Sequence, residues 1–166
     1  ARFLMTQLLV LALPGIPAFY LPALLATPND LGRFRRTGQR RDLNRPQFKA
    51  DTVERRLQDP DSDATAVTSV LAHALRVRRD QPALHPDAAM EVMSAGRSDL
   101  VMLRRRGGGQ TLVAVHNVTP SRLTLVLGRL GGRTGLAWTD CLSGSSETHG
   151  SQLQLEPYAV HWLIQA

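Results

Sequence analysis

Six arginines within a short polar segment are the densest group of side chains in this sequence that could do chemistry. They are Arg33, Arg35, Arg36, Arg40, Arg41 and Arg45, and only Asp30 and Asp42 offset their charge nearby. We call residues 26–48, "ATPNDLGRFRRTGQRRDLNRPQF", the arginine loop, because glycine, proline and asparagine interrupt it and it has no apolar period. Irregular segments of this length are uncommon in compact proteins and tend to be functional. The sequence therefore predicts a long irregular loop, and its role is left to the interpretations below.

Three interpretations of the arginine loop remain open from residue types alone. Clustered arginines neutralise the phosphates of a nucleic acid, although Phe34 is the only aromatic residue early in the loop. One or two arginines could instead fork onto the hydroxyls, carboxylate or phosphate of a small substrate. The third interpretation is a solvated surface loop without a ligand.

Composition limits the class of protein. The 166 residues are 43% hydrophobic and 20% charged, which is typical of one or two small soluble domains. Cys141 is the only cysteine, which excludes an intrachain disulfide and a cysteine-rich metal site and favours a cytoplasmic location. The net charge of +6 comes almost wholly from arginine and only weakly suggests an anionic partner.

The arginine loop must be positioned by the elements on either side of it. Residues 2–13 are good helix formers that end at Pro14, and the apolar run 16–21 suits a buried strand. After the loop, a helix is predicted from Asp61–Asp63 to Pro82, because Val67, Leu71 and Leu75 recur at a spacing of four. A helix, a tight turn and a buried strand together predict part of an α/β unit.

The apolar stretch before the loop is long enough to be considered as a membrane span. Pro14, Pro17 and Pro22 argue against one, because each lacks a backbone N–H and breaks a hydrogen bond that lipid cannot replace. We expect no membrane partner, and a membrane anchor over residues 3–25 is the alternative.

The second half of the chain changes to a period of two. "RLTLVL" and "QLQLE" alternate leucine with polar residues, "DLVMLRRR" and "TLVAVHNV" flank a glycine turn, and "YAVHWLI" ends the chain. These segments predict a small antiparallel β-domain that begins between His85 and Ala88. Trp138 and Trp162 fall in predicted strands and are expected in its core.

Other reactive residues are scattered. His73 lies on the predicted helix, and Cys141 with His149 would need an orienting partner to act as a nucleophile pair. Asn117–Thr119 matches a glycosylation sequon but is followed by Pro120. Tyr20 follows the apolar run, where packing and a place near a substrate are both open.

The order of these segments resembles the C-terminal end of glycoside hydrolase family 13, the α-amylase superfamily. "PGIPAFYL" is common across that superfamily, whereas "ND" (residues 29–30), "RTG" (36–38) and "RDLNR" (41–45) are typical of its sucrose phosphorylase-like branch. The resemblance covers nearly the whole chain. It implies that residues 1–86 are the last α/β units of a (β/α)8 TIM barrel and that residues 87–166 are an antiparallel, β-sandwich-like C-terminal domain.

The resemblance also implies an activity. The branch transfers glucosyl units by retaining double displacement, with sucrose and phosphate giving glucose 1-phosphate and fructose. Sugar and inorganic phosphate are the partners implied, with no nucleic acid, cofactor or metal. Arg41, the first arginine of "RDLNR", matches the family position that closes the glucose subsite and is the substrate-binding residue implied.

The catalytic carboxylates of the family lie on earlier barrel strands, so the resemblance implies a missing N-terminal barrel region and an inactive chain. Asp30 and Asp42 are expected to pair with neighbouring arginines rather than to act in catalysis. The acceptor stays open, because related members act on glucosylglycerate or glucosylglycerol, and an α-amylase-family hydrolase is a further possibility. A stand-alone, non-catalytic module that binds sugar or nucleic acid is the alternative from another class.

Overall fold

The computed structural model describes residues 1–133, 136–148 and 151–165. The chain divides into two units, Ala1–Pro17 with His73–Ala166, which we call the β unit, and Ala18–Ala72, which we call the helical unit. Helix α5 (Asp63–Asp80) contributes residues to both. The domain division predicted at residues 86 and 87 stays a prediction.

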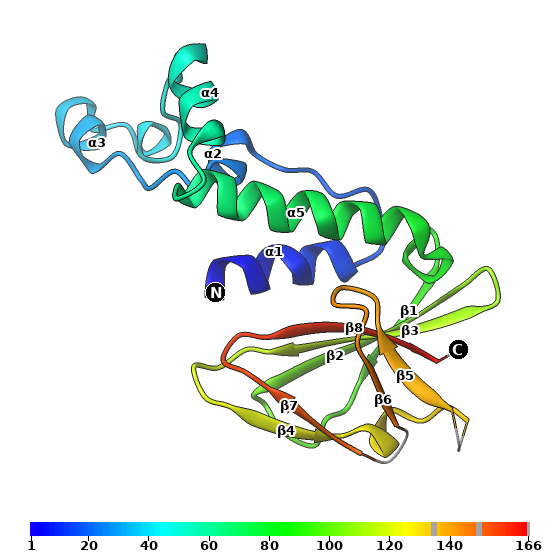
Figure 1. Cartoon of the computed structure of the whole chain (residues 1–166). Helices are drawn as coiled ribbons and strands as arrows, with labels where there is room; N and C mark the ends of the chain where they lie inside the picture. The colour runs from blue at the N-terminus through cyan, green and yellow to red at the C-terminus, as the bar shows by residue number, and fades with distance from the viewer. Residues whose placement is uncertain (134–135, 149–150, 166) are drawn as a thin grey trace. The chain divides into compact units, whose positions relative to one another are not determined.

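The β unit contains a six-stranded sheet and a two-stranded sheet (Figure 1). The large sheet has the order β1-β2-β3-β8-β5-β6. Its strands are β1 (Ala89–Met93), β2 (Leu100–Gly107), β3 (Gln110–Asn117), β8 (Val160–Gln165), β5 (Ala137–Asp140) and β6 (Ser146–Thr148). The small sheet pairs β4 (Leu123–Val126) with β7 (Gln152–Leu155), and the 3-10 helix η3 (Leu127–Leu130) follows β4. All strand pairs among the described residues are antiparallel, which confirms the predicted antiparallel domain.

The predicted hairpin is formed by β2 and β3. Gly107 pairs with Gln110, which leaves Gly108 and Gly109 as a two-residue turn with φ of +55° and +75°. Such a turn needs positive φ at both positions, which glycine adopts without a steric penalty. The glycine run therefore sets the register of the two central strands.

The core of the β unit lies between its two sheets. Leu123, Leu125 and Leu155 of the small sheet pack with side chains of β2, β3 and β8, and Trp138 joins this cluster. Trp138 is 2% exposed and Trp162 is fully buried, so both predictions of a core tryptophan are confirmed. Helix α1 (Arg2–Ala12) lies beside the large sheet and contacts β3 (Figure 1). Its buried side chains include Leu8 and Leu11.

The start of the chain is helical as predicted, but the strand predicted over residues 16–21 is wrong. Residues 16–20 are irregular, and α2 (Leu21–Leu24) follows. A parallel strand needs hydrogen-bonded neighbours, and none among the described residues pairs with this segment. Pro22 lies in the first turn of α2, where a missing N–H costs nothing. No helix among the described residues is both long and apolar enough to cross a membrane.

The helical unit holds more regular structure than the sequence predicts. The arginine loop, expected to be irregular, contains α3 (Leu31–Thr37) and the 3-10 helix η1 (Arg40–Leu43), and α4 (Ala50–Gln58) follows it. Neither short helix has an apolar stripe, so hydrophobic periodicity does not detect them. Helix α5 is confirmed, with Val67 and Leu71 buried. The 3-10 helix η2 (Pro82–Leu84) then leads to β1.

Candidate substrate-binding loop

Two carboxylates organise the arginine loop. The Asp30 side chain accepts a hydrogen bond of 2.7 Å from the backbone N–H of Arg33 and so caps the N-terminus of α3. Asp42 is 8% exposed and forms an ion pair of 3.3 Å with the Arg33 guanidinium. The backbone N–H of Asp30 donates to the Leu43 carbonyl at 2.7 Å. These contacts hold η1 against the start of α3.

The expectation that both aspartates pair with neighbouring arginines is confirmed for Asp42. Asp30 differs, because it accepts from a backbone N–H and not from a guanidinium. Both carboxylates are therefore engaged in holding the loop, and the structure gives neither a geometry suited to acid or base chemistry.

Arg41 lies on η1 with an exposed side chain. Its Nε donates to Gln39 Oε1 at 3.0 Å, which orients the guanidinium. Among the described residues, no hydrogen bond or ion pair involves its two terminal nitrogens. A guanidinium held by Nε alone keeps its two terminal nitrogens free to fork onto a carboxylate, a phosphate or adjacent hydroxyls.

The other arginines of the loop differ from Arg33. Their side chains are exposed, and within the described ranges none makes an ion pair: Arg35, Arg36, Arg40 and Arg45. The loop thus contains a partly buried ion pair that rigidifies it, together with a set of free cations at its surface. This arrangement can bind an anionic or polyhydroxyl ligand.

An anchor of the loop was missed by sequence reasoning. Arg56 of α4 donates through Nη2 to the Leu25 carbonyl at 2.5 Å and through Nη1 to Thr27 Oγ1 at 3.4 Å. These contacts fasten the residue just before the arginine loop, and Thr27 within it, to a helix that follows the loop. The only sequence signal is that Arg56 belongs to a short charged helix, which does not reveal its partners. Tyr20 is half exposed directly before α2, and its role stays a prediction.

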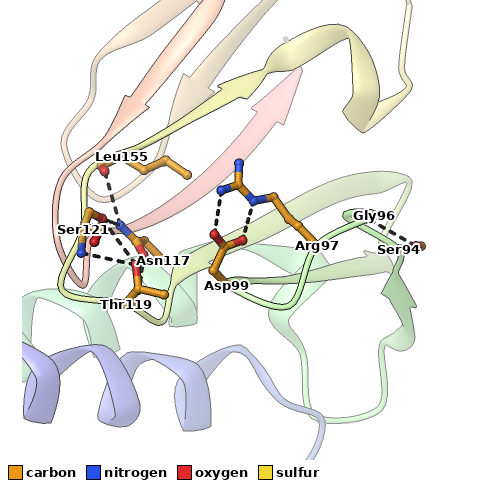
Figure 2. A network of polar contacts seen from close by, with 8 residues as sticks. All are labelled: Ser94, Gly96, Arg97, Asp99, Asn117, Thr119, Ser121 and Leu155. Carbon is orange, nitrogen blue, oxygen red and sulfur yellow. Dashed lines mark hydrogen bonds and ion pairs between the residues drawn. The ribbon is translucent and has the colours of Figure 1, made fainter.

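Asn117 is a structural residue. It is fully buried, and its Nδ2 donates to the carbonyls of Ser121 at 2.7 Å and Leu155 at 3.3 Å (Figure 2). It also donates to the Glu156 carbonyl at 2.8 Å. Its Oδ1 accepts from the backbone N–H and the hydroxyl of Thr119. The amide ties the end of β3 to the segments around β4 and β7. A buried amide with these partners does not match an exposed glycosylation acceptor.

Asp140 organises the residues around Cys141. It is 3% exposed and accepts hydrogen bonds from His161 Nδ1 at 3.0 Å and from the backbone N–H of Trp162 at 2.9 Å. Burial disfavours its charged form, but these hydrogen bonds and one from the Leu142 N–H outweigh burial and lower the pKa of Asp140. Burial, with the adjacent Asp140 charge, raises the pKa of the Cys141 thiol to about 11.

A thiol with a raised pKa stays protonated at neutral pH, which does not suit a nucleophile. His149, the other half of the pair considered from the sequence, lies outside the described residues. His73 Nε2 contacts the Leu142 carbonyl at 2.8 Å, which gives that histidine a structural contact. Within the described ranges, no group of three or more His, Cys, Asp or Glu side chains could hold a metal ion.

Two buried arginines were also missed by sequence reasoning. Arg78 is 7% exposed and donates to backbone carbonyls of residues 11, 13 and 15, including the Gly15 carbonyl at 2.7 Å. Arg105 is fully buried and donates to the Ala12 carbonyl at 2.8 Å. Burial lowers the pKa of both guanidinium groups. Both cations satisfy carbonyls at the C-terminus of α1, which is the negative end of that helix.

Comparison with known proteins finds relatives among phosphorylases. The chain is 32% identical over 166 residues to a glucosylglycerate phosphorylase of Allomeiothermus silvanus, covering 99% of this chain and 27% of that protein. It is 26% identical over 163 residues to a glucosylglycerate phosphorylase of Escherichia coli K12, covering 98% and 28%. A match of 32% over 94 residues relates 57% of the chain to 18% of a glucosylglycerol phosphorylase of Marinobacter adhaerens. The chain spans about a quarter of the length of the first two relatives.

Solved structures share the fold of nearly the whole chain. The trehalulose synthase MutB of Pseudomonas mesoacidophila MX-45 superposes with a TM-score of 0.71 at 16% identity, covering 99% of this chain and 38% of that one. AmyP in complex with maltose gives a TM-score of 0.72 at 12% identity, covering 98% and 34%. At such low sequence identity, these superpositions establish a shared fold and not a shared function. No family model matches the chain.

Proposed function

Because the chain belongs to the α-amylase superfamily, in glycoside hydrolase family 13, we propose that it forms part of a phosphorylase that transfers a glucosyl unit to inorganic phosphate. The observation that carries the proposal is the similarity of almost the whole chain to glucosylglycerate phosphorylases. The chain spans about a quarter of those proteins, so the activity is proposed for a longer protein that includes it.

In this proposal the arginine loop supplies part of the glucose subsite. Arg41 binds the sugar through its two terminal nitrogens, while Gln39 holds its Nε. The ion pair between the buried Asp42 and the partly exposed Arg33 keeps η1 in place. A preorganised guanidinium loses little rotamer entropy when the sugar binds, which is the advantage of a loop held in this way.

The chemistry assigned to the longer protein is retaining double displacement. A carboxylate attacks the anomeric carbon and the acceptor leaves with a proton from a second carboxyl group, after which phosphate displaces the enzyme carboxylate. We assign neither carboxyl role to this chain, because Asp30 caps α3 and Asp42 is paired. The catalytic carboxyl groups are proposed to come from barrel strands outside this chain. The longer protein is proposed to act in the cytoplasm.

We propose glucosylglycerate as the glucosyl donor, with glycerate as the group released. The names of the relatives in Allomeiothermus silvanus and Escherichia coli support this choice. Sucrose, with fructose released, is the second candidate, because "RTG" and "RDLNR" resemble motifs of the sucrose phosphorylase-like branch. The two donors differ in charge at the acceptor, so a direct assay separates them.

The test measures glucose 1-phosphate formed by the longer protein from glucosylglycerate, sucrose or glucosylglycerol with phosphate. Arg41→Ala should lower kcat/KM about 10-fold to 100-fold, the range for losing hydrogen bonds from a charged donor. Arg40→Ala, a neighbour that is equally exposed and unpaired within the described residues, is the matched control and should stay near the parent value.

Equal effects of the two substitutions would refute the role of Arg41, and release of free glucose without glucose 1-phosphate would make the protein a hydrolase. The 166-residue chain by itself should form no glucose 1-phosphate. Activity of the isolated chain would contradict the assignment of the catalytic carboxylates.

A further inference from the structure

A cavity of about 830 Å³ lies in the β unit, whereas the arginine loop belongs to the helical unit. Its lining comes from β2, β3 and the turn between them, from β5 and β8, and from η2, η3 and the connection after η3. Cavities of roughly 300 to 1,000 Å³ are typical of sites for small organic ligands. We call this cavity the β pocket.

Arginines give the β pocket a positive charge. Arg104 and Arg106 are two residues apart on β2, so their side chains lie on the same face of the sheet. Glu91 of β1 pairs with both, at 3.0 Å and 3.5 Å. Arg133 is the third arginine of the lining, and one glutamate leaves the three cations with an excess of positive charge.

The backbone of Arg133 is held firmly while its guanidinium is free. Gln165 Oε1 accepts from the Arg133 backbone N–H at 2.7 Å, and Gln165 Nε2 donates to the Arg133 carbonyl at 3.0 Å. Gly132, with φ of +95°, lets the amide approach, because a Cβ there would stand 2.3 Å from Gln165 Oε1. Among the described residues, no hydrogen bond or ion pair involves the Arg133 guanidinium.

The lining also includes apolar side chains and a buried donor without a partner. Leu130, Leu136 and Trp138 contribute the apolar part. Trp138 is 2% exposed, and its Nε1 has no hydrogen-bond partner among the described residues. This donor is covered by the protein, so the cavity offers a ligand its arginine side chains and its apolar surface rather than the indole N–H. A bare phosphate ion would leave most of this volume and all of its apolar surface unused.

We propose that the β pocket binds a small sugar that carries an oxyanion, either a phosphate or a carboxylate. Arg106 and Arg133 hold the oxyanion, and the sugar ring occupies the part lined by Leu136 and Trp138. The choice of a sugar phosphate rests on the proposed function, whereas the oxyanion follows from the arginines alone. The β pocket is thus a second ligand site, separate from the glucose subsite proposed for Arg41.

The test is isothermal titration calorimetry of the 166-residue chain with glucose 1-phosphate, glucuronate, inorganic phosphate and glucose. At least one of the two charged sugars should bind more tightly than either phosphate or glucose, and the tighter one identifies the oxyanion. Arg133→Ala and Arg106→Ala should each weaken that binding at least about 10-fold, as expected for a lost charge-assisted hydrogen bond. Arg133→Lys, which keeps the charge but not the fork, should lie between.

Arg129→Ala is the matched control, because Arg129 is an exposed arginine of η3 outside the lining and its loss changes the net charge equally. It should leave the dissociation constant within about twofold of the parent value. The near-ultraviolet circular dichroism of Trp138 and Trp162 checks that each variant is folded. Because glucose 1-phosphate also fits the glucose subsite proposed for Arg41, the binding assigned to the β pocket is the part that Arg133→Ala removes and Arg41→Ala leaves.

Several results would overturn the proposal. If inorganic phosphate bound as tightly as both charged sugars, the ligand would be an oxyanion without a sugar. If Arg129→Ala weakened binding as much as Arg133→Ala, the binding would come from the general positive charge and not from the β pocket. If neither charged sugar gave a binding heat at about 10 mM, the β pocket would not be a ligand site. Loss of binding on Arg41→Ala would place the ligand in the arginine loop. Failure of the phosphorolysis assay with binding intact here would refute the proposed function alone.

Discussion

Replacing Arg105 with alanine is expected to destabilise the β unit by about 2 to 4 kcal/mol. The fully buried guanidinium donates to the carbonyls of Ala12 and His85 at 2.8 Å and of Ala88 at 3.2 Å. Hydrogen bonds from a charged donor contribute about 1.5 to 3 kcal/mol each. The gross loss is therefore roughly 4 to 9 kcal/mol, and relief of the desolvation penalty of a buried cation offsets several kcal/mol of it.

Urea unfolding followed by tryptophan fluorescence measures this effect in the right unit, because Trp138 and Trp162 are the only tryptophans and both belong to the β unit. With a slope near 2 kcal/mol/M, the midpoint for Arg105→Ala should fall by about 1 to 2 M. The midpoint for Arg105→Lys should fall by less, because the single lysine nitrogen keeps the charge but cannot reach all three carbonyls.

Arg106→Ala is the matched control, since Arg106 follows in the same strand but is 55% exposed, and within the described ranges its one ion pair is with Glu91 at 3.5 Å. An exposed ion pair of this kind contributes about 0 to 1 kcal/mol. If Arg105→Ala lowered the midpoint no more than Arg106→Ala, the three carbonyl contacts would not stabilise the fold and the reasoning would be refuted.

Two further predictions concern the same unit. Burial, with His161 nearby, lowers the pKa of His116 from 6.5 to about 4, so as the pH falls through this interval the unfolded state takes up a proton that the folded state does not. Stability should fall by roughly 3 kcal/mol between those pH values. In urea titrations at several pH values, His116→Leu should remove most of this dependence of the unfolding free energy on pH. An unchanged pH dependence would contradict the assignment to His116. A Cβ at Gly107 would stand 2.6 Å from the Pro82 carbonyl oxygen, so Gly107→Ala should lower the thermal midpoint through a clash worth about 1 to 3 kcal/mol. Gly109→Ala, with nothing within 4 Å but φ of +75°, should cost only about 1 kcal/mol of backbone strain, and equal melting shifts would exclude the clash.

The elements that were predicted well are those with a local signal. Helix α5 followed from leucine and valine spacing, and the β2–β3 hairpin followed from glycines that adopt positive φ. Short helices inside the arginine loop were missed, because the Asp30 cap and the ion pair of Asp42 with Arg33 specify them in place of an apolar stripe. The strand predicted over residues 16–21 failed because a strand depends on neighbours that a local pattern does not contain.

In the candidate site, too, the sequence indicated some of the residues but not the contacts that hold them. The density of cations in the arginine loop and the resemblance of "RDLNR" to a phosphorylase motif point to Arg41 from residue types and order alone, and that role stays a prediction. The sequence did not indicate that Gln39 holds Arg41 or that Arg56 anchors the loop. Likewise, it did not indicate that Gln165 holds the backbone of Arg133 beside a cavity.

The sequence by itself determined the helix at the start of the chain, helix α5, the antiparallel β-domain and the abundance of cations. Tertiary structure alone decided which of those cations are buried. Arg104, Arg105 and Arg106 are consecutive, yet only Arg105 is fully buried, because alternation along β2 turns it away from the face that Arg104 and Arg106 share. Its partner, the Ala12 carbonyl, lies 93 residues earlier in the chain. A helix end that distant satisfies a buried charge only after the chain has folded, so no local pattern could identify it.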